Sequence, residues 1–251
     1  MATVNKIWLQ LGQSWNNGQG GNLHLLQTAY NKRMINVRIM TDNGFKCINP
    51  PDNNNQYPTA NQNDGVSIEF YFQDIAEHLG EDVYLVKYAQ GSTRLQLDNT
   101  RTDWNVASVG ELYDGTIAAI NDAISWMNTR GKQYSFEGVV WYQGEGDCIP
   151  LSAANEYQQN LIDLMAGLVS ATGNANLKFY QYNIVNPPSG NRQYLTTVNT
   201  AKLNFTNLDT ANRKLFTPVV TDWNADNIHP SVAGYLDLWN HYQKQLILND
   251  L

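Results

Sequence analysis

The strongest constraint on the fold is the alternation of short apolar runs with longer segments of helical periodicity. Helices of about ten or more residues join parallel strands through right-handed crossovers. The alternation of strands and helices therefore predicts a three-layer α/β/α fold with a mostly parallel, five-stranded sheet. The predicted strands span residues 6–11, 82–89, 136–142, 177–185 and 215–222. The predicted helices span residues 66–80, 111–131, 152–173, 192–205 and 229–248.

One segment departs from this alternation. Residues 35–51 alternate polar and apolar side chains around an Asp-Asn-Gly turn at 42–44, a pattern typical of a β-hairpin. We expect this hairpin to be inserted on the surface. The polar loop that follows, residues 52–64, resembles a calcium loop only faintly, since Tyr57 stands where the sharp turn requires glycine. No metal site is predicted there.

The charge and hydropathy of the chain restrict its partners. It carries 16 basic and 23 acidic residues, a net charge of −7, and no Lys/Arg cluster offsets this. Such a surface repels phosphate backbones, so nucleic acid is not an expected partner, whereas neutral glycans or small esters are. No run approaches the roughly 18 apolar residues that span a bilayer, and no secretory signal is recognisable. We therefore expect no membrane association, and a protein that is cytoplasmic, trimmed of a signal, or part of a larger extracellular or virion assembly.

The cysteines do not suggest a disulfide, and the length does not suggest more than one domain. Cys47 and Cys148 form no spacing pattern, so two reduced thiols are expected, with a disulfide as the less favoured alternative. The length of 251 residues suits one large α/β domain, and no repeat or linker interrupts it. Residues 1–251 are therefore predicted to form a single domain, whose oligomeric state the sequence does not indicate.

Polar residues collect where the predicted strands end. Ligands of open parallel sheets bind beyond the carboxyl ends of the strands, and the segments at these ends together carry the parts needed for acyl transfer. They contain Ser14 after the first strand, Gly91 and Ser92 after the second, Gln143, Glu145 and Asp147 after the third, and Asp226 and His229 after the fifth.

Acyl transfer gives each of these residue types a role. A serine hydroxyl is a weak nucleophile unless a base removes its proton, so Ser14 requires a partner such as His229. Asp226, three residues before His229, can reach the Nδ1–H of the ring and leave the other nitrogen to face Ser14. The oxyanion of the tetrahedral intermediate needs aligned donors, for which the candidates are the backbone N–H groups of Ser14 and Gly91 and the side-chain amide of Gln143.

Other interpretations of these residues stay open at this point. A serine after a strand is more often a turn residue, and three carboxylates could serve His229. Asp226 is favoured because it lies in the same loop, while Glu145 and Asp222 are alternatives. Glu145 follows Gln143 by two residues, so both side chains would point to one side of an extended chain. Glu145 could also be a structural carboxylate that braces its loop.

Four segments resemble the sequence blocks of a known superfamily. "GQSWN" (12–16), "AQGSTRL" (89–95), "WYQGEGD" (141–147) and "DNIHP" (226–230) are similar to the four blocks of the SGNH hydrolases. The most similar branch is that of the sialate O-acetylesterases and acetylxylan esterases, carbohydrate esterase family 6. The resemblance spans residues 7 to about 245, and the third block is its most distinctive part.

The resemblance implies both an activity and a set of roles. It implies a flavodoxin-like serine esterase that uses no metal or organic cofactor and hydrolyses small acyl esters, acetyl esters above all, on the hydroxyls of an acetylated carbohydrate through an acyl-enzyme. Ser14 would be the nucleophile, His229 the base and Asp226 the residue that orients it. Gly91 and Gln143 would complete the oxyanion hole, with Glu145 as an accessory residue.

Two departures from the branch bear on the substrate. Trp15 follows the serine where asparagine is usual, and Gln90 replaces the first glycine of the second block. Both can reshape the acyl or sugar pocket without removing a catalytic atom. Two rival functions remain: a catalytically silent carbohydrate-binding or structural domain, and a lipid esterase or thioesterase. The asparagine-rich loops near Ser14 do not suggest the apolar channel that a long acyl chain requires.

Overall fold

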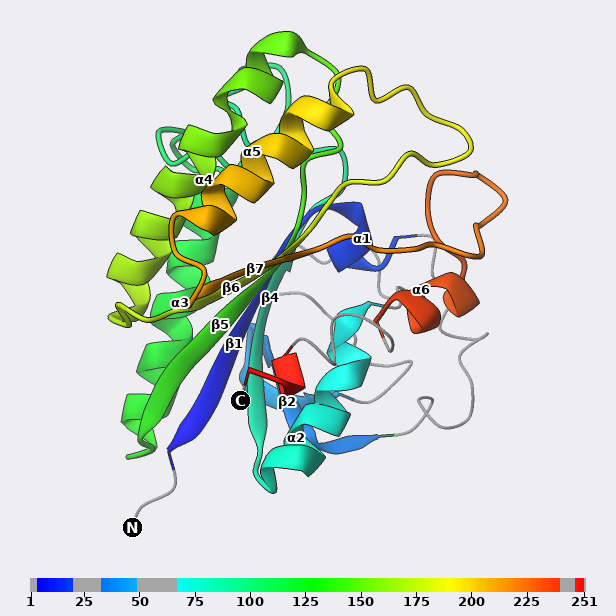
Figure 1. Ribbon diagram of the computed structural model, residues 1–251. Helices are drawn as coiled ribbons and strands as arrows, with labels where there is room; N and C mark the ends of the chain where they lie inside the picture. Colours follow the sequence, from blue (N-terminus) through cyan, green and yellow to red (C-terminus); the bar gives the residue numbers. More distant parts are fainter. Residues whose placement is uncertain (1–3, 20–32, 49–66, 240–246, 251) are drawn as a thin grey trace.

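The computed structural model describes residues 4–19, 33–48, 67–239 and 247–250, and shows a sheet covered by helices on both faces (Figure 1). The strand order is β3-β2-β4-β1-β5-β6-β7. Every neighbouring pair is parallel except β2 and β3. The strands are β1 (Asn5–Gly12), β2 (Met34–Thr41), β3 (Gly44–Ile48), β4 (Val83–Ala89), β5 (Tyr134–Tyr142), β6 (Lys178–Tyr182) and β7 (Arg213–Phe216).

The helices divide between the two faces of the sheet, as the predicted crossovers require. In Figure 1, α3, α4 and α5 lie on one face, and α1, α2 and α6 lie on the other. The predicted α/β class is therefore confirmed. The helices are α1 (Ser14–Asn17), α2 (Phe72–Leu79), which continues the 3-10 turn η2 (Ile68–Tyr71), α3 (Leu112–Thr129), α4 (Leu151–Thr172), α5 (Leu195–Asn207) and α6 (Val232–Leu238).

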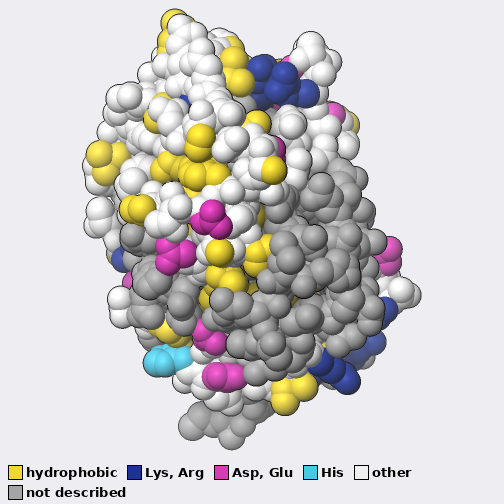
Figure 2. Space-filling view, turned by 90° about the vertical axis from the view of Figure 1, so that its right-hand side faces the viewer, with side chains coloured by type: hydrophobic (Ala, Val, Ile, Leu, Met, Phe, Trp, Pro, Cys, Tyr) yellow, Lys and Arg dark blue, Asp and Glu magenta, His cyan; other side chains and the backbone are white. Residues whose placement is uncertain are grey.

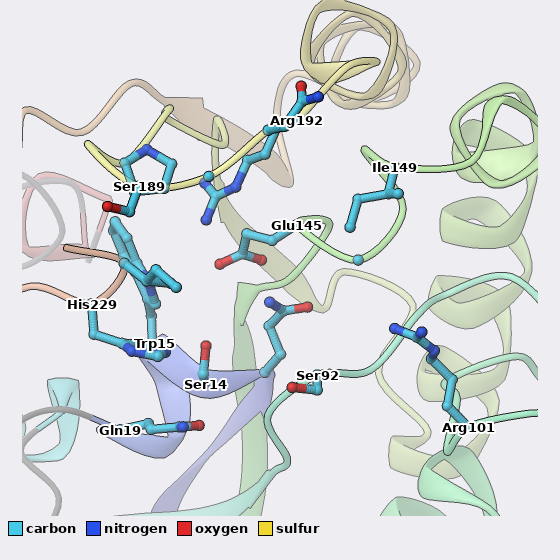
Figure 3. Close-up of a pocket in the computed structure, with 16 residues that line it drawn as sticks. Ser14, Trp15, Gln19, Ser92, Arg101, Glu145, Ile149, Ser189, Arg192 and His229 are labelled. Atoms are coloured by element: carbon cyan, nitrogen blue, oxygen red, sulfur yellow. The ribbon is translucent and has the colours of Figure 1, made fainter. Parts of the chain in front are cut away.

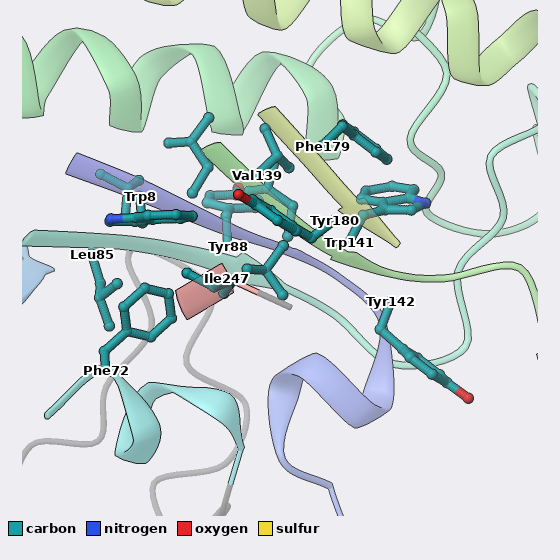
Figure 4. Close-up of a cluster of buried hydrophobic side chains, with 14 of the residues drawn as sticks. Trp8, Phe72, Leu85, Tyr88, Val139, Trp141, Tyr142, Phe179, Tyr180 and Ile247 are labelled. Carbon is teal, nitrogen blue, oxygen red and sulfur yellow. The ribbon is translucent and has the colours of Figure 1, made fainter. Parts of the chain in front are cut away.

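The central strands are buried along most of their length. All of β4 is buried, as is β1 from its third residue onward, as expected for parallel strands with helices on both faces. Aromatic rings fill much of the interior: Trp8 packs against Phe72 of α2 and Tyr180 of β6, with ring centroids 5.6 and 5.8 Å apart (Figure 4). This packing fixes the strand ends from which the loops of the site emerge.

The sheet has seven strands where five were predicted, because the two strands of the predicted hairpin extend the sheet at one edge. The hairpin forms with a tight turn, since Thr41 pairs with Gly44. However, β2 also pairs in parallel with β4, through Val37, Arg38 and Ile39. The edge of β4 would otherwise expose a row of unpaired backbone groups, and the half-apolar β2 satisfies them.

The remaining elements agree with the sequence in place and type, with shifted ends. The last strand was predicted at residues 215–222 but ends at Phe216. The last helix was predicted over residues 229–248; α6 begins at Val232, where the Ser231 hydroxyl accepts the N–H of Gly234 at 3.1 Å. The polar loop at residues 52–64 lies outside the described residues.

Cys47 and Cys148 lie apart and form no disulfide. Cys47 is in the edge strand β3, whereas Cys148 is buried in the loop after β5. These strands stand four places apart in the sheet, roughly 19 Å at about 4.8 Å per strand. The expected reduced state therefore agrees with the structure.

The described surface carries no large apolar region on the side shown in Figure 2, where small groups of apolar side chains alternate with polar and acidic ones. Within the described ranges, no helix combines the length and the apolar character needed to cross a membrane.

Candidate active site

A pocket of about 310 Å³ opens at the carboxyl ends of the parallel strands (Figure 3). Its walls come from the loops that follow β1, β4, β5, β6 and β7, which are separated in sequence and meet at this edge of the sheet. Of the residues singled out from the sequence, the pocket is lined by Ser14, Ser92, Glu145 and His229.

Ser14 is the first residue of α1 and lies just past the end of β1. Gly12 permits this placement, because its φ is +138° and a Cβ there would lie 2.2 Å from the carbonyl oxygen of Tyr142. The chain then turns sharply, held by the Gln13 N–H, which donates to the same Tyr142 oxygen at 2.8 Å. Ser14 is left 7 % exposed, and Figure 3 shows its hydroxyl pointing into the pocket.

The residues after Ser14 fix α1 in place. The Asn16 amide donates to the carbonyls of Leu11 at 2.6 Å and Val140 at 3.1 Å. Trp15, the departure from the family pattern, is buried and stacks on Tyr142 with ring centroids 4.5 Å apart. Trp223 and Tyr235 pack against it in edge-to-face arrangements, with ring centroids 5.9 and 6.3 Å away. The tryptophan thus joins α1 to the segment that carries His229.

His229 and Asp226 form a hydrogen-bonded pair. The His229 Nδ1 lies 2.6 Å from the Asp226 Oδ2, while the other carboxylate oxygen accepts the backbone N–H groups of Ile228 and His229 at 2.9 and 3.0 Å. Asn227 adopts the left-handed conformation between them, with φ of 53°, which asparagine tolerates better than most residues. The tight turn therefore aims the carboxylate at the ring.

The electrostatics of the pair favour a charged aspartate. Desolvation acts to raise the pKa of Asp226, but the hydrogen bonds from the His229 ring and from two backbone N–H groups outweigh it and lower the pKa. Asp222, an alternative partner for the histidine, instead accepts the hydroxyl of Ser231 at the start of α6. Asp222 is therefore engaged away from the ring.

Gly91 packs directly against the serine. A Cβ on Gly91 would lie 3.5 Å from the Cβ of Ser14 and 2.5 Å from the Oε1 of Gln19, so a side chain there would crowd the pocket. The next residue, Ser92, has a positive φ of 62° and lines the pocket. The backbone at Gly91 is thus brought next to the serine that it was predicted to assist.

Gln143 is placed differently from the expectation. It is buried, and its amide nitrogen donates to Asp147 at 2.6 Å and to the Thr93 carbonyl at 3.3 Å, so both amide hydrogens have acceptors. Its side-chain oxygen accepts the Tyr157 hydroxyl at 3.0 Å. In this arrangement Gln143 ties the loop after β5 to the loop after β4, and its role as an oxyanion donor stays a prediction.

A second glutamine lies closer to the site than the sequence suggested. Gln13 lines the pocket and is 4 % exposed, and its side-chain oxygen has no hydrogen-bond partner among the described residues. Its position within the Gly-Gln-Ser block was the one available signal, because the residue beside Ser14 shares its surroundings.

Glu145 lines the pocket without a hydrogen bond to any other described residue. It is 7 % exposed, and neither carboxylate oxygen has a partner in the described structure. Burial raises the pKa of Glu145, against the opposing charges of Arg192, Lys202 and His229. Because it makes no hydrogen bond to its loop, the structural brace considered from the sequence is not what the structure shows.

Arg192 is a pocket residue that sequence reasoning missed. It lies in the loop between β6 and α5, donates from Nη1 to the carbonyl of Val185, and lines the pocket. Figure 3 shows its guanidinium and the Glu145 carboxylate directed toward one another. The loop after the fourth predicted strand carried no recognised block, so its sequence gave no reason to consider it. Within the described ranges, no group of three His, Cys, Asp or Glu residues is placed to hold a metal ion.

Comparison with solved structures relates the whole chain to others of the same fold. A protein from Arabidopsis thaliana superposes with a TM-score of 0.72 at 19 % identity, over 96 % of this chain and 98 % of that one. NanS gives a TM-score of 0.67 at 12 % identity, over 99 % and 98 %. A carbohydrate acetylesterase from Xanthomonas citri gives 0.59 at 14 % identity, over 91 % of this chain and 52 % of that one.

The sequence itself identifies the family. No curated protein matches it closely enough to count. The family profile described as carbohydrate esterase, sialic acid-specific acetylesterase matches residues 4–248, nearly the whole chain. The predicted resemblance to the sialate O-acetylesterases is thereby confirmed, and the chain belongs to the family of sialic acid-specific acetylesterases among the carbohydrate esterases.

Proposed function

We propose that this protein is a serine esterase of one domain, residues 1–251, that removes acetyl groups from carbohydrate hydroxyls. The observation that carries the proposal is a single pocket lined by both Ser14 and His229, with His229 held by Asp226 at 2.6 Å. Membership of an acetylesterase family supports the same activity. A nucleophile, a base and an acid that orients the base form the Ser-His-Asp arrangement that carries out acyl transfer in serine hydrolases.

The reaction follows from these three groups. The Ser14 oxygen attacks the ester carbonyl while the free nitrogen of His229 takes its proton, and Asp226 stabilises the resulting imidazolium. Collapse of the tetrahedral intermediate breaks the bond to the sugar oxygen, which receives the proton from His229. Water then attacks the acetyl-enzyme, His229 again accepts the proton, and acetate and the free serine are released.

The negative oxygen of each tetrahedral intermediate needs donors already in place. We assign the backbone N–H groups of Ser14 and Gly91 to this role, since Gly91 packs against the serine. The third donor predicted from the sequence is the Gln143 amide, which braces two loops in the structure. Gln13 is the alternative, because it lines the pocket.

The lining of the pocket favours a small, polar ester. Most of the lining residues carry charged or polar side chains, although apolar atoms make up more of the lining surface; Ile149 and Ile228 are exposed apolar residues among them. The volume of about 310 Å³ lies at the lower end for ligand pockets. A long acyl chain would require an extended apolar channel, so a lipid esterase or thioesterase fits this lining less well.

Substitution of the serine tests the proposal. Ser14→Ala should reduce hydrolysis of p-nitrophenyl acetate to the background rate and leave thermal unfolding unchanged. Ser170→Ala, at an exposed position on α4, is the matched control and should retain full activity. Wild-type protein should prefer the acetate ester to the octanoate. Retained activity in Ser14→Ala would reject the nucleophile, and inactive wild type would favour a carbohydrate-binding domain.

A further inference from the structure

Glu145 differs from every other buried carboxylate in the described structure, because no other described residue donates a hydrogen bond to either of its oxygens. Burying an ionised group without partners is unfavourable by several kcal/mol, so such groups are normally paired or hydrogen-bonded. Asp147, two residues later, shows the usual arrangement: it accepts the N–H groups of Leu95 and Gln96 and the Gln143 amide. An unpartnered carboxylate that lines a pocket points to a ligand that supplies the missing donors.

The positive groups around Glu145 do not supply these donors. Lys202 is buried and donates its ammonium to the carbonyl of Gln143 at 2.8 Å. Arg192 donates to Val185, and His229 pairs with Asp226. None of the three makes an ion pair with Glu145 within the described residues, although their charges favour its ionised form.

The chemistry of the ester narrows what the missing donors can be. A carboxylate only accepts hydrogen bonds, and an acetyl ester has no hydrogen to donate. The donors must therefore come from the alcohol part of the substrate. In Figure 3 the Ser14 hydroxyl points toward the Glu145 carboxylate from the opposite side of the pocket. A ligand with an ester at Ser14 and hydroxyls on neighbouring carbons would reach both.

We propose that Glu145 is a specificity-determining residue that accepts hydrogen bonds from free hydroxyls of the sugar ring whose acetyl group is attacked by Ser14. Arg192, whose guanidinium faces the same space, donates to oxygens of that ring and keeps the carboxylate ionised. This inference rests on the proposed esterase function. It adds the part of the substrate that Glu145 recognises, which is the hydroxyls beside the ester.

The test compares esters with and without neighbouring hydroxyls. The probes are p-nitrophenyl acetate, a mono-O-acetylated hexose with free hydroxyls beside the ester, and the same compound with those hydroxyls methylated. Hydrogen bonds to a charged group predict that Glu145→Gln lowers kcat/KM for the free-hydroxyl sugar by roughly 10- to 100-fold, mainly through KM. The loss on p-nitrophenyl acetate should be at least several-fold smaller. Methylation of the substrate should lower the kcat/KM of the wild type by a larger factor than it lowers that of the Glu145→Gln variant.

Controls separate this inference from the function on which it rests. Glu77→Gln removes a carboxylate from the exposed surface of α2, where it accepts the Gln73 amide, and should change neither substrate's kinetics. Equal losses on all three esters in Glu145→Gln would overturn the inference and assign Glu145 to the chemistry at His229. That result leaves the serine esterase intact if Ser14→Ala is inactive, whereas an active Ser14→Ala removes the proposed function itself.

Discussion

Two buried glutamates near the nucleophile helix show opposite arrangements. Glu69 is fully buried, and its oxygens accept the Lys87 ammonium at 2.7 Å and the Gln10 amide at 2.8 Å. Glu145 is nearly as buried but accepts no hydrogen bond from any other described residue. Within the described part of the chain, other side chains donate to both oxygens of Glu69 and to neither oxygen of Glu145. The comparison separates a charge that belongs to the scaffold from one that is left for a ligand.

The network around Glu69 acts on α1. The Gln10 amide also lies 2.9 Å from the Asn16 carbonyl, and the Ser67 hydroxyl donates to the Trp15 carbonyl at 3.0 Å. The Trp15 carbonyl also accepts the Gly18 N–H at 3.2 Å, and the last carbonyls of so short a helix need such partners from outside it. The ion pair and the glutamine therefore hold the helix that carries Ser14 from its end opposite the serine.

The largest expected effect concerns whether Glu145, rather than Asp226, serves the histidine. Asp226→Asn should lower kcat by up to roughly 10⁴, because the amide favours the wrong ring tautomer and no longer supports the imidazolium. Glu145→Gln and Asp222→Asn should lower it less. Steady-state kinetics at one pH on folded protein decide the matter. A greater loss in Glu145→Gln would make that carboxylate part of the triad and end the comparison.

The next effect tests the scaffold side of the comparison. Lys87→Met leaves the Glu69 charge buried without its ion pair and should reduce the free energy of unfolding by about 3–5 kcal/mol. Urea denaturation measures it. The double variant Lys87→Met, Glu69→Leu should recover part of the loss, since no buried charge remains. If the single variant is as stable as the wild type, Glu69 is not held by Lys87 in the way described.

The smallest effect has the opposite sign. Burial raises the pKa of Glu145 above its value in the unfolded chain. Between these two pKa values the folded state binds more protons than the unfolded state, so the stability of the wild type falls as the pH rises through this range. Glu145→Gln should therefore stabilise the protein by roughly 1 kcal/mol at pH 8, part of the ~1–3 kcal/mol penalty of an unpartnered polar group.

Thermal unfolding measured as a function of pH checks this gain in stability. The gain should disappear below the ordinary glutamate pKa of about 4.3, where the carboxyl is protonated in both the folded and the unfolded state. A variant that is less stable than the wild type at pH 8 would mean that Glu145 is structural after all.

The parts of the candidate site that could be predicted from the sequence are those whose residues lie within one short segment. Ser14 in Gly-Gln-Ser, and His229 three residues after Asp226, need only a strand end and a tight turn to be placed. The family match and the fold class rest on the same blocks and on the periodicity of the strands and helices. Local patterns of this kind can be recognised without knowledge of the tertiary contacts.

What the sequence concealed depends on contacts between distant segments. The commitment of the Gln143 amide to Asp147 and the Thr93 carbonyl requires the loops after β4 and β5 to touch. Arg192 enters the pocket because of where its loop passes, with no motif around it. The pairing of β2 with β4 likewise depends on which sheet edge is left open. Such features follow from packing.

The rings around Trp15 have a consequence for when the protein gains activity during folding. Tyr142 lies at the middle of the chain, and Trp223 and Tyr235 lie near its far end, yet all three pack on the residue that follows Ser14. Contacts between segments so distant in sequence form late, because a long loop must close first. We therefore expect the serine and the histidine to come together late in folding, so that incompletely folded chains are hydrolytically silent.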